Sequence, residues 1–234
     1  MFGVIINCIT VILGSIIGIS FHRFIPKKMT DGIMTGIGLC TLYIGFDGAL
    51  KGENTLVLII SMALGAVIGY ALDIDGKINI LSKVITEKFS KNTDSSKASQ
   101  GFVTASLIFC VGAMTLVGSI QAGVSGDNTL LITKSILDLV SSIALSATFG
   151  FGVMLSAMFV FVFQEGLVLL SGLIEPYLTV TLQNEMICAG SVMIIGLGLN
   201  IIGVTKIKVA NYLPAMIIAP LITPLLNKFV ELIG

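Results

Sequence analysis

The scarcity of charged side chains constrains this 234-residue sequence most. Only 11% of its residues are Asp, Glu, Lys or Arg, against about 25% in a soluble domain, and 55% are hydrophobic. Disordered chains have the opposite composition and are excluded. The 13 basic residues balance the 13 acidic residues, which excludes the basic surface of a nucleic-acid-binding protein. We therefore expect an all-α, polytopic integral membrane protein surrounded by lipid.

The apolar stretches predict about eight transmembrane helices in one transmembrane domain that covers residues 1–234. A helix needs about 20 apolar residues to cross the hydrocarbon core. The break at residues 150–152 contains no polar residue, so a re-entrant or kinked segment there is an alternative. The predicted spans are residues 2–21, 32–50, 55–72, 101–124, 129–149, 152–173, 187–204 and 209–232.

A more polar segment, residues 73–100, is predicted to be a cytoplasmic loop. Within it, Ile78, Leu81, Ile85 and Phe89 recur at helical spacing with lysines between them. This pattern is typical of a basic amphipathic helix on the membrane surface, and a solvated loop helix is the alternative. Residues 92–100 are interpreted as a polar linker.

The basic residues predict the orientation in the membrane. With eight alternating spans, ten of them fall on one side, and only Lys51 and Lys228 fall on the other. Loops rich in Lys and Arg stay in the cytoplasm, so both termini are predicted outside the cytoplasmic membrane of a bacterium. The ten residues are Arg23, Lys27, Lys28, Lys77, Lys83, Lys88, Lys91, Lys97, Lys206 and Lys208.

Two stretches predict an internal helical-hairpin repeat. Residues 41–56 and 115–130 align without a gap at an offset of 74, with identities that include Thr41/Thr115, Gly52/Gly126 and Asn54/Asn128. A weaker third copy ends at Asn200. Many transporters, and also some channels and other membrane proteins, are built from repeats of helical hairpins.

Three ionisable residues lie inside predicted spans. Each costs about 2.5–3.5 kcal/mol on insertion scales and is a candidate functional group for that reason. Lys134 and Asp138 share one helix face at spacing i, i+4. Glu165 lies in the next span, without a partner in its own helix. The pair either locks two helices together or lines a cavity that binds a solute, and Asp138 or Glu165 could carry a coupling proton.

Other polar side chains extend this candidate binding or proton-coupling site. Interhelical hydrogen bonds of such groups contribute only about 0.6 kcal/mol on average, so structural packing is the alternative role for each. Recurrence at the repeat positions 47, 121 and 200 favours function. The residues are Asn7, Asp47, Gln121, Gln164, Asn200 and Asn211.

The last predicted span contains Pro214, Pro220 and Pro224. Because proline lacks a backbone donor, these residues are expected to free the carbonyls of Ala210, Met216 and Pro220. Broken helices of this kind form ion or substrate sites in transporters, although a kinked packing helix is the alternative.

Enzyme chemistry has little support. His22 is the single histidine, none of the four cysteines lies in a CxxC pair, and no phosphate-binding glycine loop is present. We therefore predict no enzymatic activity, no metal site and no cofactor.

Several stretches together resemble one known family. They include Gly14-Ser15 with Gly18, residues 109–114 and 118–123, and Gly126-Asp127 with Lys134 and Asp138. On these motifs the chain resembles, over its whole length, the bacterial membrane-protein family catalogued as domain of unknown function 554. The resemblance implies an inner-membrane protein, described for some members as a transporter. The family pattern near residue 164 reads aromatic-Gln-Gly, whereas this chain has Phe163-Gln164-Glu165-Gly166, so the resemblance implies no family-wide role for Glu165.

The favoured hypothesis is a secondary transporter of a small solute or ion. Its site would lie near mid-membrane between the central repeat and the proline-rich last helix. A membrane scaffold or accessory subunit is the first alternative, and a passive channel is the second. The substrate is not predicted, and a homo-oligomer is compatible with the faces rich in small residues.

Overall fold

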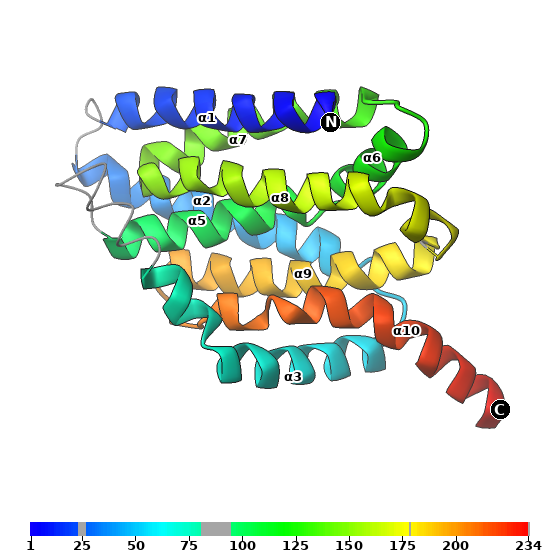
Figure 1. The fold of residues 1–234 in the computed structure, drawn as a ribbon. Helices are drawn as coiled ribbons and strands as arrows, with labels where there is room; N and C mark the ends of the chain where they lie inside the picture. Colours follow the sequence, from blue (N-terminus) through cyan, green and yellow to red (C-terminus); the bar gives the residue numbers. More distant parts are fainter. Residues whose placement is uncertain (23–26, 81–94, 178, 234) are drawn as a thin grey trace. The chain divides into compact units, whose positions relative to one another are not determined.

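The computed structural model describes residues 1–22, 27–80, 95–177 and 179–233, and every regular element in these ranges is helical (Figure 1). A short helical stretch also covers residues 74–80. The main helices are α1 (Phe2–His22), α2 (Lys27–Ala49), α3 (Thr55–Leu72), α5 (Ser95–Cys110), α6 (Ala113–Val124), α7 (Thr129–Phe149), α8 (Phe151–Ile174), α9 (Val180–Ile201) and α10 (Pro214–Ile233), with 3-10 turns η1 (Glu175–Tyr177) and η2 (Val209–Tyr212).

Seven helical segments in the described ranges are long and apolar enough to cross a membrane singly. The eighth candidate is a bent pair, residues 96–110 and 114–124, whose axes differ by 61°. The polytopic all-α membrane fold is thus confirmed, and the span predicted at 101–124 consists of two helices, α5 and α6, rather than one.

Helix ends differ from the predicted bounds where polar residues continue a helix. α5 begins at Ser95, so residues 95–100 are helical and the prediction of a linker up to residue 100 is wrong there. α9 begins at Val180, seven residues before the predicted start at 187, because the side chain of Thr179 caps it by accepting the N–H of Leu182. The centre of the predicted amphipathic helix, residues 81–94, lies outside the described residues.

The break near residue 150 is a one-residue turn between two full helices. Gly150 has φ +68° and ends α7, and α8 starts at the next residue. This φ lies in the left-handed region, which glycine enters without the steric cost paid by other residues. Because α7 has 21 residues and α8 has 24, each is long enough to be a separate span.

The chain forms two compact units, whose boundaries fall inside α2, inside the helical stretch 74–80 and after Tyr177. Unit 1 comprises Met1–Ile37 and Ile78–Tyr177, and unit 2 comprises Gly38–Lys77 and Leu178–Gly234. Unit 1 therefore contains α1, α5, α6, α7 and α8. Unit 2 contains the second half of α2 together with α3, α9 and α10.

In unit 1, α1 lies along α7 (Figure 1). A Cβ atom added at Gly14 would overlap the Ser142 hydroxyl and lie 2.6 Å from the Leu139 carbonyl, and one at Gly18 would overlap Ser146. The Gly14-x-x-x-Gly18 pattern thus brings two helix backbones close together. The inward face of α1 carries small or polar residues, and its outward face carries large apolar residues such as Ile5, Ile9, Leu13 and Ile16, as lipid requires.

In unit 2, α3 packs against η2 and α10 in the same manner. A Cβ atom at Gly65 would lie 2.7 Å from Ala215, and one at Gly69 would overlap the backbone of Asn211. Farther along the unit, α2 approaches α9 at Gly45 and Gly48, which face Ile195 and Ser191. Glycine therefore sets the closest helix contacts in both units.

Candidate functional site

The Lys134–Asp138 pair is buried in unit 1. The Lys134 ammonium donates to the Asp138 carboxylate across one turn of α7, and each residue is only 6% exposed. The ammonium also lies 5.6 Å from the centre of the Phe109 ring, at the end of α5. Both residues therefore lie on one face of α7, as predicted, and this face is buried.

Asn7 connects this pair to α8. Its Nδ2 donates to Oε1 of Gln164 at 3.3 Å, and both residues are fully buried. The Asn7 side chain also interacts with the carboxyl group of Asp138. Three helices, α1, α7 and α8, thus meet through polar side chains. We call Asn7, Lys134, Asp138, Gln164 and Glu165 the polar cluster.

Glu165 is the member of the polar cluster whose hydrogen-bonding capacity is not used. It is 7% exposed, and neither carboxyl oxygen has a hydrogen-bond partner in the described part of the chain. Oδ1 of Asn7 and Nε2 of Gln164 are also unpaired there. The Cys8 thiol lies within electrostatic range of Lys134, Asp138 and Glu165, which places all three charged groups near one point of α1.

Beside the polar cluster, the chain breaks between α5 and α6. The carbonyl of Phe109 accepts the hydroxyl of Thr115 at 2.9 Å, and the carbonyl of Gly112 accepts the N–H groups of Thr115 and Leu116. The buried Cys110 lies within electrostatic range of Lys134 and Asp138. Sequence reasoning missed this break, for which Gly112 inside an apolar run is the available signal.

Gln121, also in unit 1, lies outside the polar cluster. Its side chain is exposed near the end of α6. Its backbone carbonyl accepts the N–H and the hydroxyl of Ser125. In the following loop, the hydroxyl and N–H of Thr129 donate to Asp127 and hold the pKa of that carboxyl below its usual value. These contacts shape the loop that starts α7.

Three further predicted side chains, those of Asp47, Asn200 and Asn211, belong to unit 2. Asp47 is exposed and pairs with Lys51 at 3.4 Å. Asn200 organises the loop after α9: its amide donates to the carbonyl of Ile207, and its Oδ1 accepts from Thr205 and from the N–H of Ile207. Both side chains therefore make local contacts within unit 2.

Asn211 is fully buried, in η2. Its Oδ1 accepts the N–H of Asp75 at 2.8 Å, whereas Nδ2 has no partner among the residues that the structure describes. Asn211 thus ties the segment after α3 to the turn before α10. Each unit therefore contains a buried side-chain amide with an unpaired atom. Lys134, Asp138 and Glu165, the ionisable residues of the polar cluster, all belong to unit 1.

The prediction of a free carbonyl at Ala210 is wrong. Pro214 is the first residue of α10 rather than an interior residue, and the Ala210 carbonyl accepts the N–H of Leu213 at 3.2 Å. Proline is well tolerated at that position because the first N–H groups of a helix have no partner within it. Pro220 and Pro224 do lie inside α10, so neither Met216 nor Pro220 accepts the usual i+4 backbone bond.

Sequence reasoning also missed Glu185. It lies between the predicted spans 152–173 and 187–204, but it is a buried residue of α9, 1% exposed. Its Oε1 accepts the N–H groups of Glu53 and Asn54, at 2.9 and 2.7 Å, and so holds the loop between α2 and α3. The sequence feature that indicates a helix around Glu185 is Thr179, a residue type that caps helices, placed before the apolar stretch.

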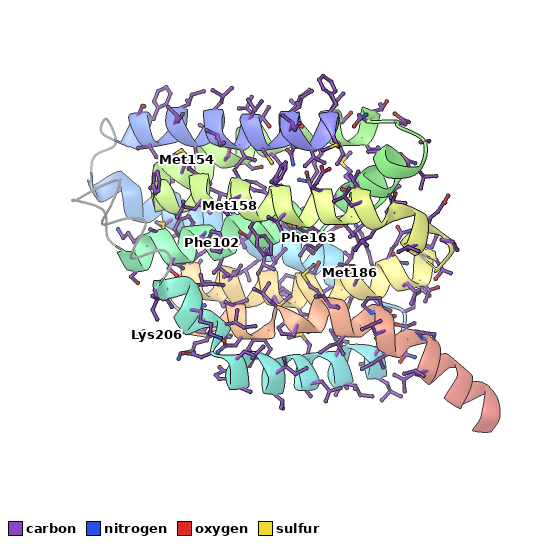
Figure 2. The ribbon with its side chains drawn as sticks, in the orientation of Figure 1. Phe102, Met154, Met158, Phe163, Met186 and Lys206 are labelled. Atoms are coloured by element: carbon purple, nitrogen blue, oxygen red, sulfur yellow. The ribbon has the colours of Figure 1, made fainter. Side chains whose placement is uncertain are left out.

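An apolar groove of about 370 Å³ runs between α1 and α8 in unit 1. Met154 and Met158, labelled in Figure 2, line it together with Ile12 and Phe161. Cys8 also contributes to its wall, and the thiol donates to the Ala157 carbonyl at 3.5 Å. In a membrane-spanning chain, such an apolar lining suits lipid.

The apolar helices and the inward polar side chains define a multi-pass helical membrane protein. The sequence profile of the family described as "Protein of unknown function (DUF554)" matches residues 2–224. The chain belongs to this family, as its motifs indicate.

Two curated relatives extend over nearly the whole chain. It is 32% identical over 233 residues to the "Uncharacterized membrane protein YdfK" of Bacillus subtilis (strain 168), covering 98% of both chains. It is 26% identical over 220 residues to the "Uncharacterized protein YqgA" of Escherichia coli (strain K12), covering 93% of this chain and 94% of that one. No solved structure gives a significant match.

Proposed function

We propose that this protein is a secondary transporter of a small solute or ion, and that the polar cluster is its substrate site. The observation that carries the proposal is the buried carboxyl of Glu165, which has no partner in the described part of the chain. Burying a carboxyl group without hydrogen-bond partners is costly, so a ligand that supplies the missing contacts is favoured there.

Structural packing alone accounts poorly for the polar cluster. Polar groups used to join helices are normally satisfied by one another, because each unpaired buried group costs about 1–3 kcal/mol. Here the Lys134–Asp138 pair is satisfied, but Glu165, Asn7 Oδ1 and Gln164 Nε2 retain unused capacity. We propose that a ligand of the protein occupies these unused polar atoms.

The break between α5 and α6 supports the same proposal. Irregular backbone at membrane depth is tolerated where protein or water satisfies it, and transporters commonly build binding sites at such breaks. Because Lys134 lies over the Phe109 ring and Cys110 lies within electrostatic range of Asp138, the break and the polar cluster adjoin.

We also propose that the hairpins α2–α3 and α6–α7 form an internal repeat. At the sequence offset of 74, α3 begins at Thr55 and α7 at Thr129. The next equivalent residues, Val57 and Leu131, are both fully buried. Ser61 and Ser135 then both donate to the carbonyl four residues earlier. A repeated hairpin is the construction that transporters with alternating access use.

The experiment is a measurement of cysteine access that needs no known substrate. A variant that keeps Cys110 alone is labelled with a charged methanethiosulfonate reagent in right-side-out and inside-out vesicles. If the polar cluster opens to each side in turn, reversing the membrane potential raises the labelling rate from one side and lowers it from the other. A variant that keeps Cys188 alone, buried in unit 2, is the control.

Two outcomes contradict a transporter. If the labelling rates of Cys110 from the two sides rise and fall together when the membrane potential is reversed, the protein is a channel. An absence of Cys110 labelling from either side, with the unfolded protein labelled normally, indicates a scaffold whose polar residues serve packing.

A further inference from the structure

Resting on the proposed function, we infer that the ligand of the polar cluster is a monovalent cation and that the carboxylate of Glu165 binds it. The cation is either a proton or an alkali metal ion, and the experiment below separates these two sources. The substrate or coupling species of the site is then a monovalent cation rather than an unspecified solute or ion.

The charge of the polar cluster requires a positive ligand. Within residues 2–21, 101–124, 129–149 and 152–173, the charged side chains are Lys134, Asp138 and Glu165 alone. Lys134 neutralises Asp138 through their direct contact, so an ionised Glu165 has no counter-charge within these segments. The thiols of Cys8 and Cys110 cannot supply a counter-charge, because a thiol is either neutral or, as a thiolate, negative. One monovalent cation makes the site neutral.

The unpaired atoms have the polarity that a cation needs. Three oxygens of the polar cluster lack a partner among the described residues, namely both carboxyl oxygens of Glu165 and Oδ1 of Asn7. The one unpaired nitrogen of the polar cluster is Nε2 of Gln164. Hard monovalent and divalent cations take carboxylate and amide oxygens as ligands, whereas an anion would need donors.

The ammonium of Lys134 does not serve as an anion site in this arrangement. It donates to Asp138 and lies over the Phe109 ring, so its charge is already used. An anionic ligand would have to displace Asp138 and leave a second carboxylate unpaired in the same buried region. A cation at Glu165 leaves the Lys134–Asp138 pair in place.

The test is cation-dependent thermal stability of the purified full-length protein in detergent. Melting temperatures are measured in NaCl, KCl and choline chloride at constant ionic strength, and then from pH 8 to pH 6. At concentrations above the Kd of the bound cation, each tenfold increase in cation concentration raises Tm by about 3–5 °C. A rise with Na⁺ or K⁺ identifies an alkali ion, and a rise only with acid identifies a proton.

Glu165→Gln is the decisive variant, because it keeps the side-chain shape and removes the charge. We expect its Tm to lose the cation or proton dependence. Glu175→Gln, the same change at an exposed residue, is expected to retain the wild-type dependence. Asn7→Ala removes one proposed oxygen ligand but keeps Glu165, and it should need about tenfold more cation for the same rise in Tm. This second variant also serves if Glu165→Gln does not fold.

Two results overturn the inference. One is a wild-type Tm that is the same in all three salts and at every pH, and the other is a Glu165→Gln variant that keeps the wild-type dependence. Labelling of Cys110 does not depend on which ligand binds. If Cys110 is labelled from each side in turn but Tm does not depend on cations, the cation inference is wrong and the transport proposal stands. Cation binding without access at Cys110 overturns the transport proposal instead.

Discussion

Replacing Lys134 by Met tests whether the ion pair on α7 is buried as the structure shows. Met fills a similar volume but leaves the Asp138 carboxylate without its cation. Both residues are 6% exposed, so water cannot replace the lost contact. We therefore expect a large loss of stability from this single substitution.

The magnitude follows from two independent arguments. Removing one partner of a buried ion pair costs about 3–5 kcal/mol. Alternatively, the variant can take up a proton on Asp138, which costs about 4 kcal/mol at pH 7 for a carboxyl of ordinary acidity. Since the two costs agree, Tm should fall by about 6–20 °C for a chain of this length. The loss should shrink when the pH is lowered, because protonation then costs less.

The assay is the melting temperature in detergent, followed by size-exclusion chromatography of heated samples. The double substitution Lys134→Met with Asp138→Leu should recover most of the stability, because no unpaired charge remains. Lys51→Met is a matched control: Lys51 pairs with Asp47 at the same i, i+4 spacing but is about half exposed, and its loss should cost less than about 1 kcal/mol. A Lys134→Met variant that melts with the wild type, or a double variant no better than the single one, refutes the reasoning.

Three further predictions concern packing, a loop and a surface carboxyl. Gly14→Ala should cost about 1–3 kcal/mol in thermal unfolding because its Cβ overlaps α7, whereas Gly172→Ala, in open space, should be neutral. Glu185→Ala should cost about 1–3 kcal/mol and speed amide hydrogen exchange in the α2–α3 loop, which the carboxylate holds. Thr129→Val should raise the pKa of Asp127 toward its usual value in an NMR titration, since one stabilising donor is lost. Wild-type Asp127 has the lowered pKa, so its contribution to stability is present near neutral pH and is lost as the pH falls through that value.

The class of the protein and the ionisable part of the site could be predicted from the sequence. Charge is so costly in a membrane that Lys134, Asp138 and Glu165 were recognisable as inward-facing candidates from their positions alone. Helical spacing further predicted that the first two would meet. Nothing in the linear pattern, however, indicated that Asn7 would join them, because that depends on how α1 packs against α7 and α8.

The errors have local physical causes. The break after Cys110 was missed because a single glycine inside an apolar run is common in continuous membrane helices. Pro214 was placed inside a helix, although proline also fits the first position of one. Glu185 falls outside the predicted span 187–204 because hydropathy alone does not detect the polar first turns of α9, which Thr179 caps. Backbone capping and tertiary contacts, rather than hydropathy, determine these features.

We propose that the polar cluster of unit 1 binds a cation during transport, and this proposal can be tested by recording current. Its most direct test is to record currents from proteoliposomes on a solid-supported membrane after rapid jumps of Na⁺, K⁺ or H⁺. We expect the wild-type protein to give a current for at least one of these cations, and we expect Glu165→Gln to abolish it while Glu175→Gln does not. Wild-type liposomes that give no more current than protein-free liposomes, or a Glu165→Gln variant with undiminished current, would contradict the account.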